Sequence, residues 1–463
     1  MLWLRRDLRV HDHPALHAAL QAGDGLLPVF CFDDRLINGR HTSGPRTQFL
    51  LESLADLDHS LRDRGSRLVV RKGIPERELP SLARDHDVRC VHFTADIGPY
   101  ARRRDARVSN ALEKAGIGVC AHPGLFAVDD LDAIRTSSSD PYTVFTPFYR
   151  AWAKLGRRKP VSAPRSLPKI PSGIDAGTLP SLSNLGLHQE VDEPIPGGEG
   201  AARESMSRFL SGPIDDYDAG RELVGQAGVS RLSPYLHFGC ISARELEQRL
   251  SRSAGGEAFR RQLCWRDFYA QVLWSFPSNA RSEHQVRYRG TIRWSHAQRR
   301  FEAWREGRTG FPLVDAGMRQ LSREGWMHNR ARLVVGSFLT KDLGIDWRWG
   351  ERWFMRLLLD GDEASNNGNW QWIASVGVDP QPAFRRIYNP ARQQQRLDPE
   401  GAYVRHYVPE LTSVPDAYIA APWTMPASVQ ARVGCVIGRD YPKAIVDHLV
   451  ARREALARYA AAR

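Results

Sequence analysis

Residues 26–70, LLPVFCFDDRLINGRHTSGPRTQFLLESLADLDHSLRDRGSRLVV, show the pattern from which the fold of the amino-terminal part of this chain is predicted. The apolar runs at 26–32 and 67–70 are typical of buried strands, and the spacing at 45–64 is helical. The same alternation fills the first 125 residues, with apolar runs near 2–3, 88–93 and 118–121 and helical spacing at 75–86 and 98–115. It predicts a doubly wound parallel α/β sheet. No GxGxxG sequence occurs in this part, so a dinucleotide site of that type is not indicated.

The rest of the chain changes character twice. From about Pro160 to Gly200 it is rich in Pro, Gly and Ser without sustained periodicity, which is typical of a long connector. Beyond Glu199 the spacing is mainly helical, as in FPLVDAGMRQL at 311–321. We therefore expect an α/β domain at 1–125, an interdomain connector at 126–198 and an all-α domain at 199–463.

Composition indicates a cytoplasmic protein without a membrane partner. No apolar run approaches the roughly 18 residues of a membrane span, and charges interrupt the first residues where a signal peptide needs an apolar stretch. Six cysteines show no CxxC pair and no metal-ligand spacing: Cys31, Cys90, Cys120, Cys240, Cys264 and Cys435. We expect free thiols, no disulfide, no metal site and a monomer.

Charge and aromatic content point to nucleic acid. The formal charge is +12, and 11 of the 13 tryptophans lie between Trp265 and Trp423. A basic, aromatic domain favours phosphate contacts with base stacking, although basicity alone also serves solubility or weak non-specific binding.

Residues 360–372, DGDEASNNGNWQW, are the stretch most informative about chemistry. Carboxylates and amides hydrogen-bond a polar heterocycle, and closely spaced tryptophans stack on a flat π-system or exchange electrons with it. The stretch thus indicates a redox-active, nitrogen-rich cofactor. The alternative is that its polar residues make turns and helix caps while its tryptophans pack in a core.

Five further segments accompany this stretch: DDYDAGR at 215–221, VSRLSPYLHFG at 229–239, WRDFY at 265–269, GWMHNRAR at 325–332 and KDLGIDWRWG at 341–350. In order and spacing, the six segments resemble the DNA photolyase and cryptochrome family over essentially the whole chain. Within the family, the chain is most similar to the class I enzymes for cyclobutane pyrimidine dimers.

The resemblance implies an FAD-dependent carbon–carbon lyase that passes an electron, under light, from reduced FAD to a dimer in UV-damaged DNA. Exposed N–H groups and hydroxyls before a helix suit the FAD diphosphate at VSRLS, with simple N-capping as the alternative. Asp360 and Asp362 would accept hydrogen bonds from the flavin edge and ribose, and Asn366 would lie near flavin N5. The expected FAD-binding residues are Tyr217, Val229, Ser230, Arg231, Leu232, Ser233, Arg266, Arg332, Asp360, Asp362 and Asn366.

The resemblance also assigns the lesion site. Trp265 and Trp372 would wall the flipped-out dimer, and Asn329 would contact the dimer or the flavin. Trp370, Trp347 and Trp294 match the family's tryptophan relay to oxidised flavin, with core packing as the alternative. The expected DNA phosphate partners are Arg221, Arg330, Arg385 and Arg386.

Two positions depart from the family pattern. Gln262 stands where repair enzymes commonly have Glu, and Leu333 stands where many have Met. Gln can hydrogen-bond a pyrimidine but offers neither a carboxyl proton nor a negative charge. Asn329 and Leu333 also occupy the places of the His pair of (6-4) enzymes, which disfavours that lesion. A cryptochrome-type photoreceptor without repair activity is the alternative function, and a light-independent nucleic-acid-binding protein is the third class.

The amino-terminal part resembles the members that carry an antenna pigment. The matching residues are Cys31, Phe32, Asp33, Arg46, Asp96 and Arg104, and they favour 8-hydroxy-5-deazaflavin. Folate-binding members have an Asn-Glu pair where this chain has Tyr100 and Ala101, which disfavours methenyltetrahydrofolate. The alternative is that these residues form only a strand end and a solvated helix face.

Overall fold

The amino-terminal part of the protein is the expected parallel sheet. In the computed structural model, which describes residues 1–23, 25–40, 42–225, 228–379 and 381–462, five strands pair in the order β3-β2-β1-β4-β5, and every pair is parallel. The strands are β1 (Leu2–Leu4), β2 (Pro28–Asp33), β3 (Val69–Gly73), β4 (Cys90–Thr94) and β5 (Gly118–His122). Strand β3 lies later in the chain than the apolar run at 67–70 predicts, because its pairing with β2 begins at Val69 and extends to Gly73.

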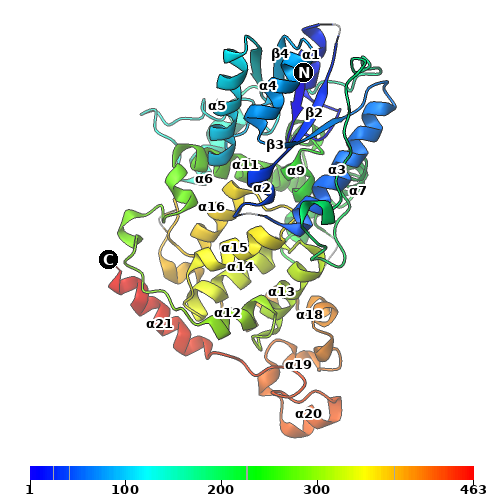
Figure 1. Ribbon diagram of the computed structural model, residues 1–463. Coiled ribbons are helices and arrows are strands. Elements are labelled where there is room, and N and C mark those ends of the chain that lie inside the picture. The colour runs from blue at the N-terminus through cyan, green and yellow to red at the C-terminus, as the bar shows by residue number, and fades with distance from the viewer. Residues whose placement is uncertain (24, 41, 226–227, 380, 463) are drawn as a thin grey trace.

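Helices cover both faces of the sheet (Figure 1). On one face α4 (Pro75–Asp85) and α5 (Pro99–Lys114) pack through Leu79 and Leu112 on Trp3 and Val91. On the other face lie α1 (Pro14–Gln21) and α3 (Gly44–Arg62), while α2 (Asp34–Ile37) follows β2. Helix α1 is not apparent in the sequence pattern because its buried residues, Ala15, Leu16 and Ala19, span little more than one turn.

The chain between the sheet and the carboxy-terminal helices contains little regular structure. Its main element is α6 (Phe145–Lys154), and a 3-10 turn, η1, occupies Ser183–Leu185. Helix α6 buries Phe148 and Trp152, and the Trp152 indole donates to Asp267 on α11 over 2.9 Å. This helix therefore packs as part of the helical core.

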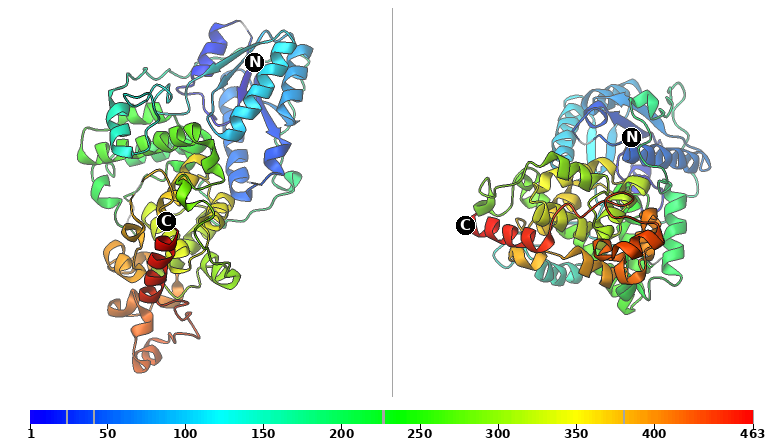
Figure 2. Two further views of the ribbon diagram at one scale, coloured as in Figure 1. Left: turned by 90° about the vertical axis from the view of Figure 1, so that its left-hand side faces the viewer. Right: turned by 90° about the horizontal axis from the view of Figure 1, so that it is seen from below.

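The carboxy-terminal part is helical. In the described residues beyond 198 the strand signal is limited to isolated bridges. The helices are α7 (Glu199–Leu210), α8 (Tyr217–Gly220), α9 (Ser233–Phe238), α10 (Ala243–Arg249), α11 (Ala254–Ser275), α12 (Gln298–Arg305), α13 (Pro312–Glu324), α14 (Asn329–Ser337), α15 (Trp347–Leu357), α16 (Glu363–Ile373), α17 (Pro390–Leu397), α18 (Ala402–Tyr407), α19 (Asp416–Ile419), α20 (Ala427–Val433) and α21 (His448–Ala461). None of the described helices is long and apolar enough to cross a membrane. The segment around α19 and α20 lies at the end farthest from the sheet (Figures 1 and 2).

The loop after β1 fastens the sheet to the helical part. Arg9 is 1% exposed and donates to the carbonyls of Gly124 and Gly239, both over 2.9 Å. Gly239 has φ +65°, and a Cβ there would lie 2.1 Å from the carbonyl oxygen of Arg6. Only glycine fits this position, both in backbone conformation and in space.

Candidate functional site

A cavity of about 530 Å³ lies within the helical part, in the size range of cofactor sites. Its walls come from α8, the loop before α9, α11, α14 and α16, and they include all eleven residues expected to bind the cofactor. They also include Gln262, Trp265, Asn329, Leu333 and Trp372, expected around the lesion, together with Trp370, Arg221 and Arg330. We call this space the helical cavity. Segments more than 150 residues apart in the sequence thus converge on one site.

The carboxylates of 360–372 are held by cations and backbone amides. Asp362 caps α16 by accepting from the Ser365 amide over 2.9 Å, and its second oxygen lies 2.7 Å from Arg6. Asp360 pairs with Arg332 over 2.9 Å. Burial alone would raise the pKa of Asp362, but Arg6 and the nearby His237 outweigh burial and hold it well below its usual range. Asp362 therefore both caps α16 and lines the helical cavity.

The loop 229–233 leaves the start of α9 without a side-chain cap. Ser230 Oγ accepts from the Leu232 amide over 3.3 Å, which keeps this hydroxyl within the loop. Arg231 has φ +52°, pairs with Glu324 over 2.7 Å and lies 4.5 Å from the Trp326 ring centre. Amides at the start of α9 and nearby guanidinium groups make this wall suitable for an anionic group.

The donor set fits a polar, flat cofactor. The buried Nε2 of His328 has no hydrogen-bond partner among the residues that the structure describes, and His328 lines the helical cavity. Burial, followed by the charge of Arg332, lowers the pKa of His328 to about 4, so the ring is neutral at pH 7. Asn366 donates to the backbone oxygen of Glu351 over 3.0 Å, which fixes the orientation of its amide. Neutral, oriented groups of this kind can hydrogen-bond a heterocycle without adding charge.

Two indoles form aromatic walls of the cavity. Trp265 stacks on Phe145 of α6, with ring centres 3.7 Å apart and planes 3° apart. Trp372 lies 3.9 Å from the guanidinium carbon of Arg386 and donates from its indole nitrogen to Asp379 over 3.2 Å. Each ring is thus supported from behind by residues outside the cavity wall.

The four expected phosphate contacts are not equivalent. Arg386 is 2% exposed, pairs with Asp379 over 2.6 Å and donates to the Trp372 carbonyl. Its expected contact with DNA phosphate is therefore incompatible with its burial, and its contacts suit the orientation of Trp372. Arg385 is exposed, Arg330 pairs with Glu222, and Arg221 lies 2.9 Å from Asp218.

The three relay candidates differ in their position relative to the helical cavity. Trp370 lines the cavity, and its ring meets Phe354 edge to face with centres 5.0 Å apart. Gly350 lies one helical turn after Trp347 on α15 and makes room for Trp370, since a Cβ there would lie 2.1 Å from that ring. Trp347 is buried, whereas Trp294 is half-buried beside Tyr459 on α21. Trp347 and Trp294 are outside the cavity lining.

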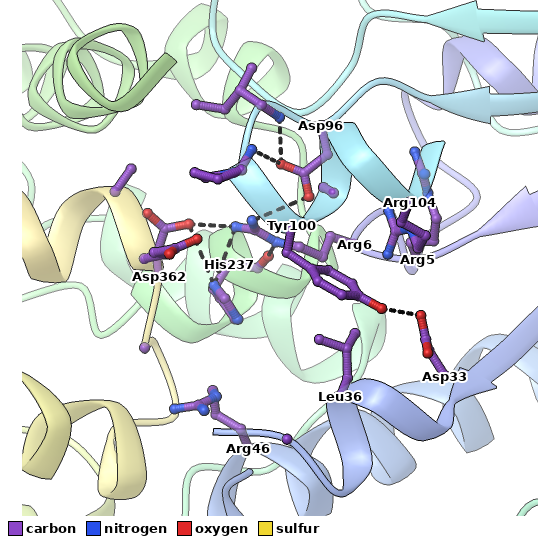
Figure 3. A pocket seen from close by; sticks show the side chains of 18 of the residues that line it. Arg5, Arg6, Asp33, Leu36, Arg46, Asp96, Tyr100, Arg104, His237 and Asp362 are labelled. Carbon is purple, nitrogen blue, oxygen red and sulfur yellow. Dashed lines mark hydrogen bonds and ion pairs between the residues drawn. The ribbon is translucent and has the colours of Figure 1, made fainter. Parts of the chain in front are cut away.

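A second cavity, of about 730 Å³, lies between the carboxyl ends of the sheet strands and the helical part (Figure 3). It is lined by all six expected antenna residues, and we call it the sheet cavity. The Tyr100 hydroxyl donates to Asp33, and Asp96 accepts from the Ile97 amide over 2.7 Å. Arg46 extends from α3 to the carbonyl of Met355 on α15.

The two cavities share one wall. His237, Arg266 and Asp362 line both, and the Arg6–Asp362 pair lies between them. Burial, followed by the charge of Arg6, lowers the pKa of His237 to about 4. The sequence did not single out Arg6, because it does not stand out in a local pattern, and His328 was visible only as part of GWMHNRAR. His237 was visible only as part of VSRLSPYLHFG.

Comparisons with known proteins agree with this arrangement. Residues 1–168 match the family model described as DNA photolyase, and residues 259–461 match the FAD binding domain of DNA photolyase. The chain is 41% identical to a deoxyribodipyrimidine photo-lyase of Streptomyces griseus, over 96% of both chains. It superposes on a bacterial class III photolyase from Agrobacterium tumefaciens with a TM-score of 0.93 and 35% identity, covering 100% of this chain and 97% of that one. A Synechocystis cryptochrome gives a TM-score of 0.90 and 32% identity, covering 99% and 98%.

Proposed function

Since this chain belongs to the DNA photolyase and cryptochrome family, with the family's FAD-binding domain, we propose that it repairs cyclobutane pyrimidine dimers in DNA under light. The observation that carries the proposal is the helical cavity. Its walls combine the expected cofactor residues with two supported indoles and the amides of Gln262 and Asn329.

The proposed cofactor is FAD, which supplies a light-absorbing electron donor when bound. Arg332 and Arg266 would balance its negative charge, while Asp360 and Asp362 would accept hydrogen bonds from its ring edge and ribose. The start of α9 would receive the diphosphate. Asn366 would favour the reduced cofactor by hydrogen bonding without adding charge.

The lesion would enter the same cavity from DNA. A dimer pairs and stacks less well than intact bases, so extruding it from the duplex costs less. Trp265 and Trp372 would grip the extruded dimer by stacking, and Gln262 and Asn329 would hydrogen-bond its polar edge. The class I subgroup and the carbon–carbon lyase reaction belong to this proposal. The division at 125 and 198, a monomeric state and a cytoplasmic location remain predictions from the sequence.

The alternative is a cryptochrome-type photoreceptor without repair. Similarity to the Synechocystis cryptochrome and the amide at Gln262 favour it. Asn366 and the complete pair of Trp265 and Trp372 favour repair. The relay proposed for Trp370, Trp347 and Trp294 serves either function, because photoreduction would restore reduced flavin in a repair enzyme and would be the light response of a photoreceptor.

We propose that the sheet cavity holds the antenna, 8-hydroxy-5-deazaflavin. The shared wall supports this proposal, because excitation would have only the layer of His237, Arg266 and Asp362 to cross. Methenyltetrahydrofolate is the competing pigment. The absorption spectrum and mass of the pigment released by denaturing the purified protein identify it, and a folate would overturn the assignment.

The decisive experiment measures repair of a duplex with one thymine dimer by photoreduced protein under blue light, with a dark control. We expect intact thymines to return only in the light. Trp265→Ala should reduce repair at least tenfold by removing a stacking wall. Trp274→Ala is the matched control, since Trp274 lies on the same helix outside the helical cavity.

A second arm separates repair from photoreduction. Trp347→Phe should slow photoreduction of oxidised flavin and leave repair by reduced flavin unchanged. If the wild-type flavin is photoreduced but the dimer persists, the protein is a photoreceptor, and Gln262→Glu becomes the substitution that tests the missing carboxyl.

A further inference from the structure

Strands β4 and β5 bring two cysteines and two histidines onto one face of the sheet. Alternate residues of a strand share a face, so Cys90 lies with His92, and Cys120 lies with His122. The parallel register places His92 opposite Cys120 and Cys90 opposite Gly118. Gly118 leaves the space beside Cys90 open, since an added Cβ there would lie 3.5 Å from its sulfur. The register thus joins two short Cys-x-His segments 30 residues apart.

The distances in this group are those of a metal site before the ion binds. The sulfurs of Cys90 and Cys120 are 3.4 Å apart, and Nδ1 of His92 lies 3.0 Å from Nε2 of His122. The ligand atoms of Cys90, His92 and Cys120 all lie within 4.8 Å of one another, whereas His122 lies outside this group and its ring would have to turn to reach the same ion. Tetrahedral zinc, with bonds of about 2.3 Å to sulfur and about 2.0 Å to nitrogen, separates two sulfurs by about 3.8 Å and two nitrogens by about 3.3 Å. The sulfur–sulfur and nitrogen–nitrogen separations are thus within a few tenths of an ångström of those around zinc.

The group can be reached by a cation. His92 is buried, whereas the two thiols and His122 are half-buried, which leaves the group accessible from solvent.

We propose that Cys90, His92 and Cys120, with His122 as the fourth ligand, bind one Zn²⁺ that links strand β4 to the edge strand β5. Two thiolates with two imidazoles are one of the donor sets of structural zinc sites. Binding would break two S–H bonds, form two Zn–S bonds and release two protons to solvent. The ion would hold the last strand of the sheet, close to the chain start, where the Met1 amino group donates to the Cys90 carbonyl over 2.9 Å.

The proposal is tested on the full-length protein after chelator treatment. Titration with Zn²⁺ in competition with a chromogenic chelator should give one site with sub-micromolar affinity. Co²⁺, added to protein with fully oxidised flavin, should give thiolate charge-transfer bands and visible bands of tetrahedral cobalt. The double variant Cys90→Ser, Cys120→Ser should lose both signals. Cys435→Ser is the matched control, a buried thiol in the helical part.

Two further measurements distinguish zinc binding from a simple contact between the two histidines and from a disulfide. His122→Ala should weaken zinc binding at least tenfold, whereas a His122 that only stacks on His92 would leave affinity unchanged. A thiol assay of the denatured, non-reduced protein should find six thiols. Four thiols would indicate a Cys90–Cys120 disulfide instead. That result would overturn the proposed zinc site. The site would also be overturned if the wild type bound zinc no more tightly than the double variant, provided that the circular dichroism spectrum of the double variant is unchanged.

Discussion

At the scale of single residues, the wall between the two cavities depends on a neutral histidine. His237 has a folded pKa of about 4, below the ordinary value of about 6.5, because burial and Arg6 oppose its charge. Below pH 6.5 the unfolded chain binds a proton that the folded protein does not bind. Stability contributed by the neutral ring therefore falls as pH decreases from about 6.5 to about 4.

We predict that His237→Asn reduces this pH dependence without abolishing it, because His328 also has a folded pKa of about 4. In the wild type, the free energy of unfolding should fall by up to about 3 kcal/mol between about pH 6.5 and about pH 4, measured by urea unfolding at several pH values. Asp362 does not obscure the effect, because its pKa is held well below its usual range and it stays ionised above pH 4. Exposed His59 provides the control: His59→Asn should keep the wild-type slope. An unchanged slope for His237→Asn would contradict the neutral-histidine account.

For helices and strands, the sequence predicted the elements that follow from a regular local spacing of apolar residues. It did not predict contacts that depend on how neighbouring strands are aligned. The five strands were expected because apolar runs alternate with helical spacing, but the extent of β3 is set by pairing with β2. The candidate metal ligands were overlooked because their Cys-x-His pairs meet only through the β4–β5 register. Arg6, which pairs with Asp362, lies 356 residues away from it in sequence.

The joint between β1 and α9 is sensitive to substitution at Gly239. We predict that Gly239→Ala destabilises the protein by at least ~3 kcal/mol, because the left-handed backbone and the 2.1 Å approach to Arg6 both oppose a Cβ. Gly434→Ala separates the two causes, since Gly434 has φ +68° with no atom within 4 Å of its added Cβ. It should cost only ~1 kcal/mol. Equal losses in urea unfolding would show that steric contact at Gly239 is unimportant.

At the scale of the whole molecule, sequence periodicity could not predict that residues far apart in the chain meet at one site. Residues from 217 to 372 line one cavity because helices far apart in the chain pack together, and no local pattern encodes that packing. The resemblance to known family members predicted which residues belong to one site. The burial of Arg386 shows the limit of that transfer, since a basic residue in a basic domain need not face DNA.

The net charge of +12 makes DNA affinity a property of the whole surface, and salt dependence measures it. We predict that the logarithm of affinity for undamaged duplex falls linearly with the logarithm of salt concentration, with a slope of about −0.9 per phosphate contact. Arg385→Gln and Arg330→Gln should each reduce the slope by about one contact. Arg386→Gln should leave this slope unchanged and instead weaken selectivity for the dimer, because Arg386 supports Trp372 from the protein interior. Fluorescence anisotropy with damaged and undamaged duplexes separates the two effects, and a lower slope for Arg386→Gln would show that the guanidinium reaches DNA after all.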